Sequence, residues 1–265
     1  MSYNIDHIYV LTTANMYERR MPNLLKNLKR VGLIDSEKDS ILDIRFGLRP
    51  NMYRYVIDNT SRIESRRYMC PSSCVSKDLS ATLSHYLIYQ EAKERGFNRV
   101  MVVEDDEIFM NDTDLFRSTL ESLPADSDLA LLDWLPVYQS NYFRNGSHRR
   151  SLERCNGSPW VKSDDYCLCT NAGCTIRSAR AVDAIIKLLE SAWYPTGLQY
   201  ADEFKAIDRW QDQGILRTFG HSMYLAYPHL CVQNPSRSVQ YSSYIGPLYS
   251  NVYDGLSKFD FSRYS

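Results

Sequence analysis

A short apolar stretch that ends in four acids constrains the fold of this chain more than any other feature. Val100 to Val103 is a continuous apolar run, and Glu104, Asp105, Asp106 and Glu107 follow it directly. A continuous apolar run predicts a strand that is covered on both faces, as in the centre of a parallel sheet. Open α/β sheets bind ligands at the carboxyl ends of such strands, so the acids mark the expected site.

The acidic segment supports two interpretations. If the strand stays extended, Glu104 and Asp106 share one face and Asp105 points to the other. Two carboxylates on one face repel each other unless a cation lies between them, and their oxygens suit Mg²⁺ or Mn²⁺. The alternative is a solvated acidic turn after the strand, which the segment alone does not exclude.

The first half of the chain alternates between strand and helix patterns. Ile5 to Leu11 predicts a central strand, and apolar residues at helical spacing from Met21 to Val31 predict a helix that Gly32 ends. Ile41 to Phe46 predicts a second strand, which makes a strand–helix–strand unit of a parallel sheet. Thr12, Arg19 and Arg20 follow the first strand, where they would meet an anionic ligand or form a solvated helix start.

A helix should also lead into the acidic strand. Asp78 is expected to be its N-cap, and the helix should run through Arg95 and end at Gly96. His85 lies on an apolar side of this helix, so it is either a core residue or a polar contact to ligand. Residues 47–78 are expected to form a basic, irregular insertion with one short strand at Tyr53–Ile57.

The second half continues the same alternation. The expected elements are strands at Asp128–Trp134 and Tyr166–Ile176, a helix capped by Ser178, a short helix near Asp202, and strands at Leu216–Phe219 and Met223–Ala226. Gly173 should kink the second of these strands. Residues 138–164 are expected to form a long functional or mobile loop, and the last thirty residues an irregular tail.

Composition argues against several classes of function. The net charge of −1 gives no support for a nucleic-acid-binding surface. No segment approaches the roughly 18 consecutive apolar residues of a membrane span, and the amino terminus lacks the pattern of a signal peptide. The seven cysteines lack zinc-site spacing and are expected to be free thiols. We therefore expect a cytoplasmic protein, either free or peripheral to a membrane.

Three blocks of sequence occur in an informative order. The first is Ile8 to Leu11 followed by Glu18-Arg19-Arg20, the second is Leu79 to His85 followed by Val102 to Asp106, and the third is Asn171 to Ser178 followed by Ala201 to Glu203 and Tyr227 to Gln233. These blocks resemble glycosyltransferase family 25, the group that contains lipooligosaccharide galactosyltransferases and collagen-galactosyltransferase-like domains. The second block is the most specific.

The resemblance implies a fold and an activity. The fold would be of GT-A type, a Rossmann-like α/β/α sandwich with a mixed, mostly parallel central sheet. One domain would span residues 1–265, with a nucleotide-binding half (1–110), an acceptor-binding half (111–245) and a C-terminal tail (246–265). The activity would be metal-dependent, inverting transfer of a hexose from a UDP-sugar, with galactose as the favoured hexose. The acceptor would be a hydroxyl of a glycan, a lipooligosaccharide or a glycoprotein.

The resemblance also implies roles for individual residues. Contacts to the nucleotide sugar are expected from Leu11, Thr12, Arg19, Arg20, Lys77, Ser84, His85, Glu104 and Asp105. Mn²⁺ or Mg²⁺ is expected at Glu104, Asp106 and His229, with His221 as the alternative to His229. Asp202 should deprotonate the acceptor hydroxyl, with Glu203 as the alternative; the other interpretation of either acid is a cap at the start of a helix.

Other residues and other functions remain open. Trp134, Trp193 and Tyr194 are expected either to offer faces to the acceptor sugar or to pack in the core. A metal-dependent phosphoesterase and a non-catalytic sugar-binding module are the alternative functions. A two-metal hydrolase normally takes several His and Asp ligands from different strands, yet the chain has only five His.

Overall fold

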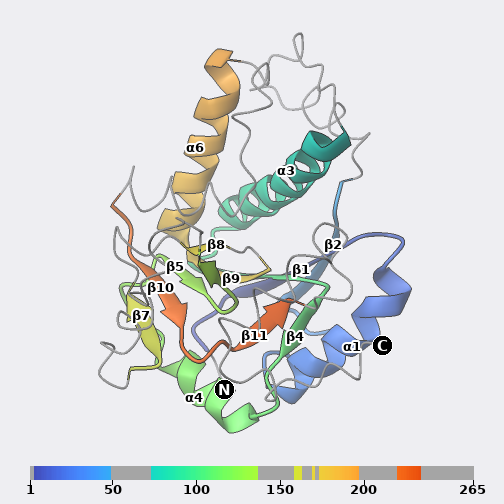
Figure 1. Cartoon of the computed structure of the whole chain (residues 1–265), viewed down its shortest axis with the longest axis vertical. Coiled ribbons are helices and arrows are strands. Elements are labelled where there is room, and N and C mark those ends of the chain that lie inside the picture. Colours follow the sequence, from blue (N-terminus) through green and yellow to red (C-terminus); the bar gives the residue numbers. More distant parts are fainter. Residues whose placement is uncertain are drawn as a thin grey trace.

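A seven-stranded sheet organises the part of the chain that the computed structural model describes, which is residues 3–48, 73–136, 158–162, 169–170, 173–196 and 220–233 (Figure 1). Its strand order is β2-β1-β3-β9-β5-β10-β7. The strands are β1 (His7–Thr12), β2 (Leu42–Phe46), β3 (Arg99–Glu104), β5 (Leu129–Leu131), β7 (Trp160–Lys162), β9 (Cys174–Ser178) and β10 (Met223–Ala226). Only β9 and β7 run against the other five strands, which confirms a mixed, mostly parallel sheet.

The opening unit has the predicted form. β1 pairs in parallel with β2, and the helix α1 (Tyr17–Arg30) connects them. After α1 the chain turns at Gly32, whose φ of +78° is a left-handed conformation that suits glycine. The periodic apolar residues of α1 face the core, because Met21, Leu24 and Leu28 are almost fully buried.

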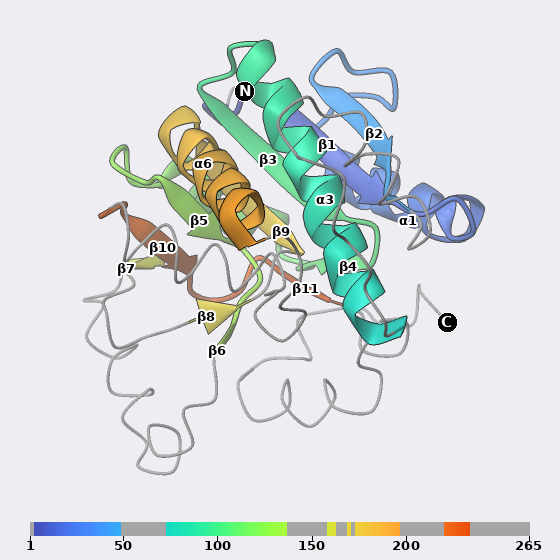
Figure 2. The ribbon, with the colours of Figure 1, turned by 90° about the horizontal axis from the view of Figure 1, so that it is seen from above.

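Alternation along the central strands builds the layers on both sides of the sheet. Ile8 and Val10 of β1 belong to the same buried cluster as side chains of α1 and of α4 (Thr113–Glu121). Tyr9 and Leu11 belong to the opposite cluster, with side chains of α3 (Ser73–Glu94) and α6 (Ala179–Thr196). Figures 1 and 2 show α3 and α6 covering one face of the sheet, which gives the expected α/β/α sandwich.

Two small ribbons flank the main sheet. β4 (Glu107–Phe109) pairs with β11 (Cys231–Gln233), and β6 (Leu135–Pro136) pairs with β8 (Cys169–Thr170). The first ribbon begins directly after the acidic turn, so residues from near position 230 approach the end of β3.

Several element boundaries differ from the predictions. α3 begins at Ser73, so Asp78 lies inside the helix and is not its N-cap; no helix breaker stands between Pro71 and Asp78. The strand expected at Asp128–Trp134 is only Leu129–Leu131, and Trp160–Lys162 in the expected long loop forms an edge strand.

The strand expected at Tyr166–Ile176 is divided. β8 and β9 are separate strands, and between them the carbonyl of Gly173 accepts a hydrogen bond from the Glu104 amide at 2.6 Å. Ser178 caps α6 as predicted, because its Oγ accepts a hydrogen bond from the Ala181 amide at 3.1 Å. The strands expected at Tyr53–Ile57 and Leu216–Phe219 and the C-terminal tail lie outside the described residues.

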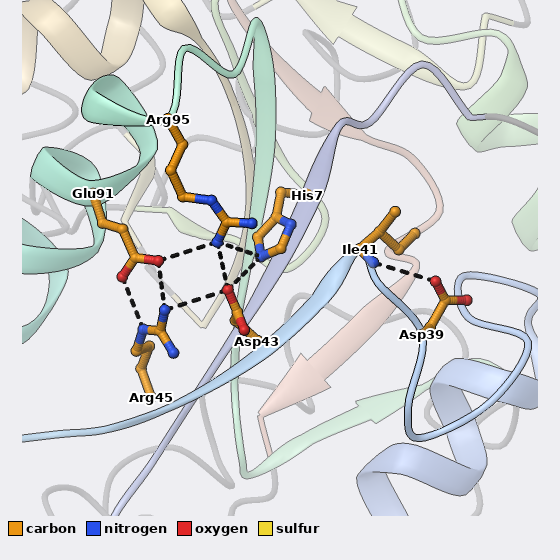
Figure 3. A network of polar contacts seen from close by, with 7 residues as sticks. All are labelled: His7, Asp39, Ile41, Asp43, Arg45, Glu91 and Arg95. Carbon is orange, nitrogen blue, oxygen red and sulfur yellow. Dashed lines mark hydrogen bonds and ion pairs between the residues drawn. The ribbon is translucent and has the colours of Figure 1, made fainter.

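A polar network fastens the edge strand β2 to α3 (Figure 3). One carboxylate oxygen of Asp43 accepts hydrogen bonds from His7 Nε2 at 2.9 Å, Arg95 Nη1 at 2.6 Å and Arg45 Nη2 at 3.3 Å. Glu91 of α3 binds the same two arginines. Burial alone would raise the pKa of Asp43, but the hydrogen bonds from Arg95 and His7 outweigh it and the pKa is lowered.

We expect Asp43→Asn to lower the free energy of unfolding by about 1–2 kcal/mol at pH 7, because it removes a charged acceptor from a partly exposed network. A lowered pKa stabilises the fold above the unfolded pKa, and this contribution disappears as the pH falls through the folded pKa. The difference between wild type and variant should therefore shrink below about pH 4 in urea titrations. Asp39→Asn is the control, because Asp39 accepts only backbone N–H groups; an equal loss there would contradict the prediction.

Candidate functional site at the carboxyl ends of the central strands

The acidic segment forms a buried turn at the end of β3. β3 ends at Glu104, Asp105 and Asp106 make the turn, and β4 begins at Glu107. The Asp105 amide donates to the carbonyl of Leu11 at 3.0 Å, which ties the turn to the end of β1. The strand does not stay extended, so the predicted alternation of faces is wrong. The alternative of a solvated turn is also wrong, because Asp105, Asp106 and Glu107 are all buried.

Asp105 is held from inside the protein. Thr12 Oγ1 donates to it at 2.5 Å, and Arg20 Nη1 donates at 2.6 Å. Arg20 and Asp105 are both 7% exposed, so the pair lies out of water. The structure therefore brings together three of the residues expected at the nucleotide sugar, and uses them to join the ends of β1 and β3 to α1.

Asp106 lies in an excess of negative charge. Its Oδ2 accepts a hydrogen bond from Gln233 Nε2 at 3.2 Å, and Arg20 Nη1 is 3.6 Å away. Its Oδ1 is buried and has no hydrogen-bond partner among the described residues. Burial, followed by the negative charge of Glu104, raises the pKa of Asp106 to about 7. Burial and the charge of Asp133 likewise raise the pKa of Glu107 well above its usual range.

Glu104 is the acid of this segment that reaches solvent. Its side chain is 28% exposed, and one of its oxygens lies 3.1 Å from His85 Nε2. His85 is fully buried, and its Nδ1 lies 3.0 Å from the hydroxyl of Tyr89. Burial lowers the pKa of His85. Both ring nitrogens of His85 thus face protein groups, as expected for the core position that the sequence left open, and its contact to the nucleotide sugar stays a prediction.

Ser84 also acts within the protein. Its Oγ donates to the Ser80 carbonyl at 2.6 Å and accepts from the Leu48 amide at 2.9 Å. The neighbouring Gly47 amide donates to the Thr12 carbonyl at 2.7 Å, so the segment after β2 lies close against the end of β1. Ser84 thus holds the segment after β2 against α3, whereas the side chain of Lys77 lies outside the described part.

Two exposed aromatic rings lie at the same edge, and sequence reasoning missed them. Tyr17 begins α1 and Phe46 ends β2; their ring centroids are 5.4 Å apart, and the two residues are 36% and 55% exposed. Arg19, which was expected at the nucleotide sugar, is exposed in the first turn of α1. The signal in the sequence was Phe46 itself, an aromatic residue at the carboxyl end of an expected strand, where its side chain would be exposed to water.

His229 lies at the correct edge, after β10, but its Nε2 is 3.1 Å from the Trp134 carbonyl. Its ring stacks on Trp134, which is fully buried and therefore packs in the core instead of offering a face to a sugar. The described residues contain no group of three or more His, Cys, Asp or Glu that could hold a metal. His221, the alternative ligand, precedes β10 and so lies at the opposite edge of the sheet.

The residues at the turn nevertheless fit a divalent cation. The unpartnered Oδ1 of Asp106 and the repulsion from Glu104 are what a cation between two carboxylates would relieve. One or two carboxylates suffice where substrate phosphates and water complete the coordination, as is usual for Mg²⁺. Asp202, Glu203 and the side chains of Trp193 and Tyr194 lie outside the described residues, so the expected base and acceptor faces stay predictions.

A cavity of about 390 Å³ lies at the opposite edge of the sheet, between Arg99, Ser127 and the start of α6. Its buried acid, Asp128, accepts hydrogen bonds from Ser178, Arg180 and the Ser222 amide. Because these contacts join the sheet to α6, Asp128 serves the fold, and the acidic turn is the better candidate for chemistry.

The fold and site define an α/β protein with a buried acidic turn at the carboxyl edge of its sheet. Neither a protein family nor a curated protein sequence matches the chain. The resemblance to glycosyltransferase family 25 therefore rests on the three sequence blocks alone. No helix in the described ranges is long and apolar enough to cross a membrane.

Solved structures give distant similarities. The apo form of the glycosyltransferase GlyE of Streptococcus pneumoniae TIGR4 is 13% identical, over 83% of this chain and 45% of that chain, with a TM-score of 0.36. Another GlyE structure is 12% identical, over 98% of this chain and 62% of that chain, with a TM-score of 0.40. The apo form of mouse xyloside xylosyltransferase 1 is 11% identical, over 83% of this chain and 84% of that chain, with a TM-score of 0.38. The chain thus spans about half the length of the first of these proteins.

Proposed function

We propose that this protein is a metal-dependent, inverting glycosyltransferase that moves a hexose from a UDP-sugar to a glycan hydroxyl. The favoured hexose is galactose. The observation that carries the proposal is the buried turn after β3, where the unpartnered Oδ1 of Asp106 lies near the partly exposed Glu104. Carboxylates that repel each other at the carboxyl edge of an α/β sheet suit a cation bound together with a diphosphate.

Each part of the site has a role in this proposal. A divalent cation held by Glu104 and Asp106 would neutralise the charge that develops on the departing diphosphate. Thr12, Arg20 and Asp105 hold the turn in place, and Arg19 is exposed where it can meet an anion. Asp202 would accept the proton of the acceptor hydroxyl as that oxygen attacks the anomeric carbon.

Binding of nucleotides with and without metal tests the proposal. We expect Mn²⁺ together with UDP or UDP-galactose to raise the melting temperature, since a ligand that binds only the folded state stabilises it. Incubation with a UDP-sugar and a glycan acceptor should then release UDP. Release of phosphate from simple esters without an acceptor, or no thermal shift with any nucleotide, would refute the proposal.

Phe46→Ala is expected to weaken UDP binding by about 5- to 150-fold, because stacking of a base on an aromatic ring is worth roughly 1–3 kcal/mol. Phe46 ends β2 and Tyr17 begins α1, and their exposed rings lie together where a uracil would stack beside the diphosphate. Titration calorimetry with UDP and with pyrophosphate measures the effect. Pyrophosphate has no base, so its affinity should not change; an equal loss for both ligands would contradict the assignment. Phe46→Tyr is the control that keeps the ring.

A further inference from the structure

A chain of buried polar side chains leads away from Glu104 into the core. Glu104 Oε1 lies 3.1 Å from His85 Nε2, and His85 Nδ1 lies 3.0 Å from the hydroxyl of Tyr89. The guanidinium of Arg177 lies over the ring of Tyr89, 4.7 Å from its centroid. His85, Tyr89 and Arg177 are all fully buried, so no solvent competes for these contacts.

Chemistry sets the direction of the hydrogen bonds. An ionised carboxylate only accepts hydrogen bonds, so His85 Nε2 must carry the proton that is donated to Glu104. In a neutral imidazole Nδ1 is then an acceptor, and the Tyr89 hydroxyl donates to it. The hydrogen bond from Tyr89 to Nδ1 therefore favours the tautomer that carries its proton on Nε2, the nitrogen that faces Glu104.

Arg177 supplies the positive end of this chain. Its Nη1 donates to Thr175 Oγ1, whereas Nε and Nη2 have no hydrogen-bond partner in the described residues. A buried cation without full hydrogen bonding is costly, so its charge needs a nearby counter-charge. The face of the Tyr89 ring attracts the guanidinium in a cation–π contact. Glu104, at the other end of the chain, supplies the negative charge.

We propose that Tyr89, His85 and Arg177 are positioning residues that hold Oε1 of Glu104 inside the protein and so direct its second oxygen to the bound cation and nucleotide. This inference rests on the proposed function of Glu104. Partners of this kind are known to orient metal ligands, and their loss typically weakens metal binding or activity by about 10- to 100-fold. In this proposal the three residues act on the cation only through Glu104.

Replacement of His85 tests the relay. His85→Leu keeps an apolar body but removes the donor to Glu104, and we expect it to weaken Mn²⁺-dependent UDP binding about 10- to 100-fold. His85→Gln keeps an amide N–H that can reach Glu104 and should stay within about threefold of wild type. Tyr89→Phe removes a single oxygen, so it tests the relay even if His85→Leu fails to fold; we expect a loss of about 3- to 10-fold.

A spectroscopic readout separates positioning from a merely structural role. Nitrogen-15 spectra of the histidine ring should show His85 as the Nε2–H tautomer, and Tyr89→Phe should move Nδ1 toward the shift of an acceptor without a hydrogen bond. An Nδ1–H tautomer in the wild type would overturn the relay. So would equal Mn²⁺–UDP affinities for the wild type, His85→Leu and His85→Gln. If the wild type itself binds no Mn²⁺–UDP, the proposed function fails, and the tautomer alone decides on the relay.

Discussion

Replacing Asp106 with asparagine is expected to stabilise the folded protein above pH 7 and to abolish its Mn²⁺-dependent binding of UDP. Asp106 has a pKa of about 7 in the folded protein, against an ordinary value of 3.8, because of burial and the charge of Glu104. A raised pKa gives a stabilisation that is complete below the unfolded pKa and is lost as the pH rises through the folded pKa. The wild type should therefore lose on the order of 4 kcal/mol between pH 4 and pH 8 from this group.

The asparagine side chain is neutral at every pH in this range, so the stability of Asp106→Asn does not fall with rising pH because of this position. Urea titrations at constant ionic strength from pH 4.5 to 8.5 should show a growing advantage of the variant, which levels off above about pH 7. Addition of Mn²⁺ and UDP should reverse the order at pH 8, because only the wild type keeps the carboxylate that the cation needs. A difference that does not depend on pH would show that the charge of Asp106 is not the destabilising element.

Asp105→Asn is the matched control, one residue away and with the same change of atoms. Asp105 is satisfied by Thr12 and Arg20, so its replacement leaves a buried guanidinium without its closest carboxylate. Breaking a buried ion pair from one side typically costs about 3–5 kcal/mol. We therefore expect Asp105→Asn to destabilise the protein at pH 8, where Asp106→Asn stabilises it.

The regular elements of this fold could be predicted from the sequence, whereas the turn that carries Asp105 and Asp106 could not. β1, α1, β2 and β3 were predicted well because the period of their apolar residues reports directly which face meets the core. The buried turn was not predicted, because its burial depends on Leu11 and Gln233, which lie far from it along the chain. A period of two along one strand contains no information about such partners.

The candidate site follows the same division. The sequence located the acidic segment and the helix that carries Ser84 and His85, since both are continuous motifs. It could not show that His85 faces inward, because a histidine on an apolar helix face fits a core position as well as a ligand contact. Gln233 and Phe46 belong to the site only through the β4–β11 ribbon and the end of β2, so tertiary contacts alone reveal them.

Asp202→Asn is expected to lower kcat for sugar transfer by about 10²- to 10⁴-fold while the affinity for Mn²⁺–UDP stays within about twofold, since a general base contributes to the reaction but not to donor binding. The proposed cation ligands are Glu104 and Asp106, and neither Asp202 nor Glu203 is one of them. Donor binding and proton transfer should therefore separate cleanly in this protein.

Measuring UDP release with acceptor present, and UDP affinity by calorimetry, gives the two quantities for each variant. Glu203→Gln makes the same change at the adjacent position and should retain most of the transfer activity if Glu203 only favours the helix start. If Glu203→Gln is the variant that loses activity, the two acids exchange roles and the proposed mechanism stands with Glu203 as the base. If neither variant changes kcat, neither acid is the base and that part of the proposed mechanism is wrong. If Asp202→Asn does lower kcat, comparison with Asp106→Asn separates the two kinds of failure, because Asp106→Asn removes Mn²⁺–UDP binding whereas Asp202→Asn leaves it intact.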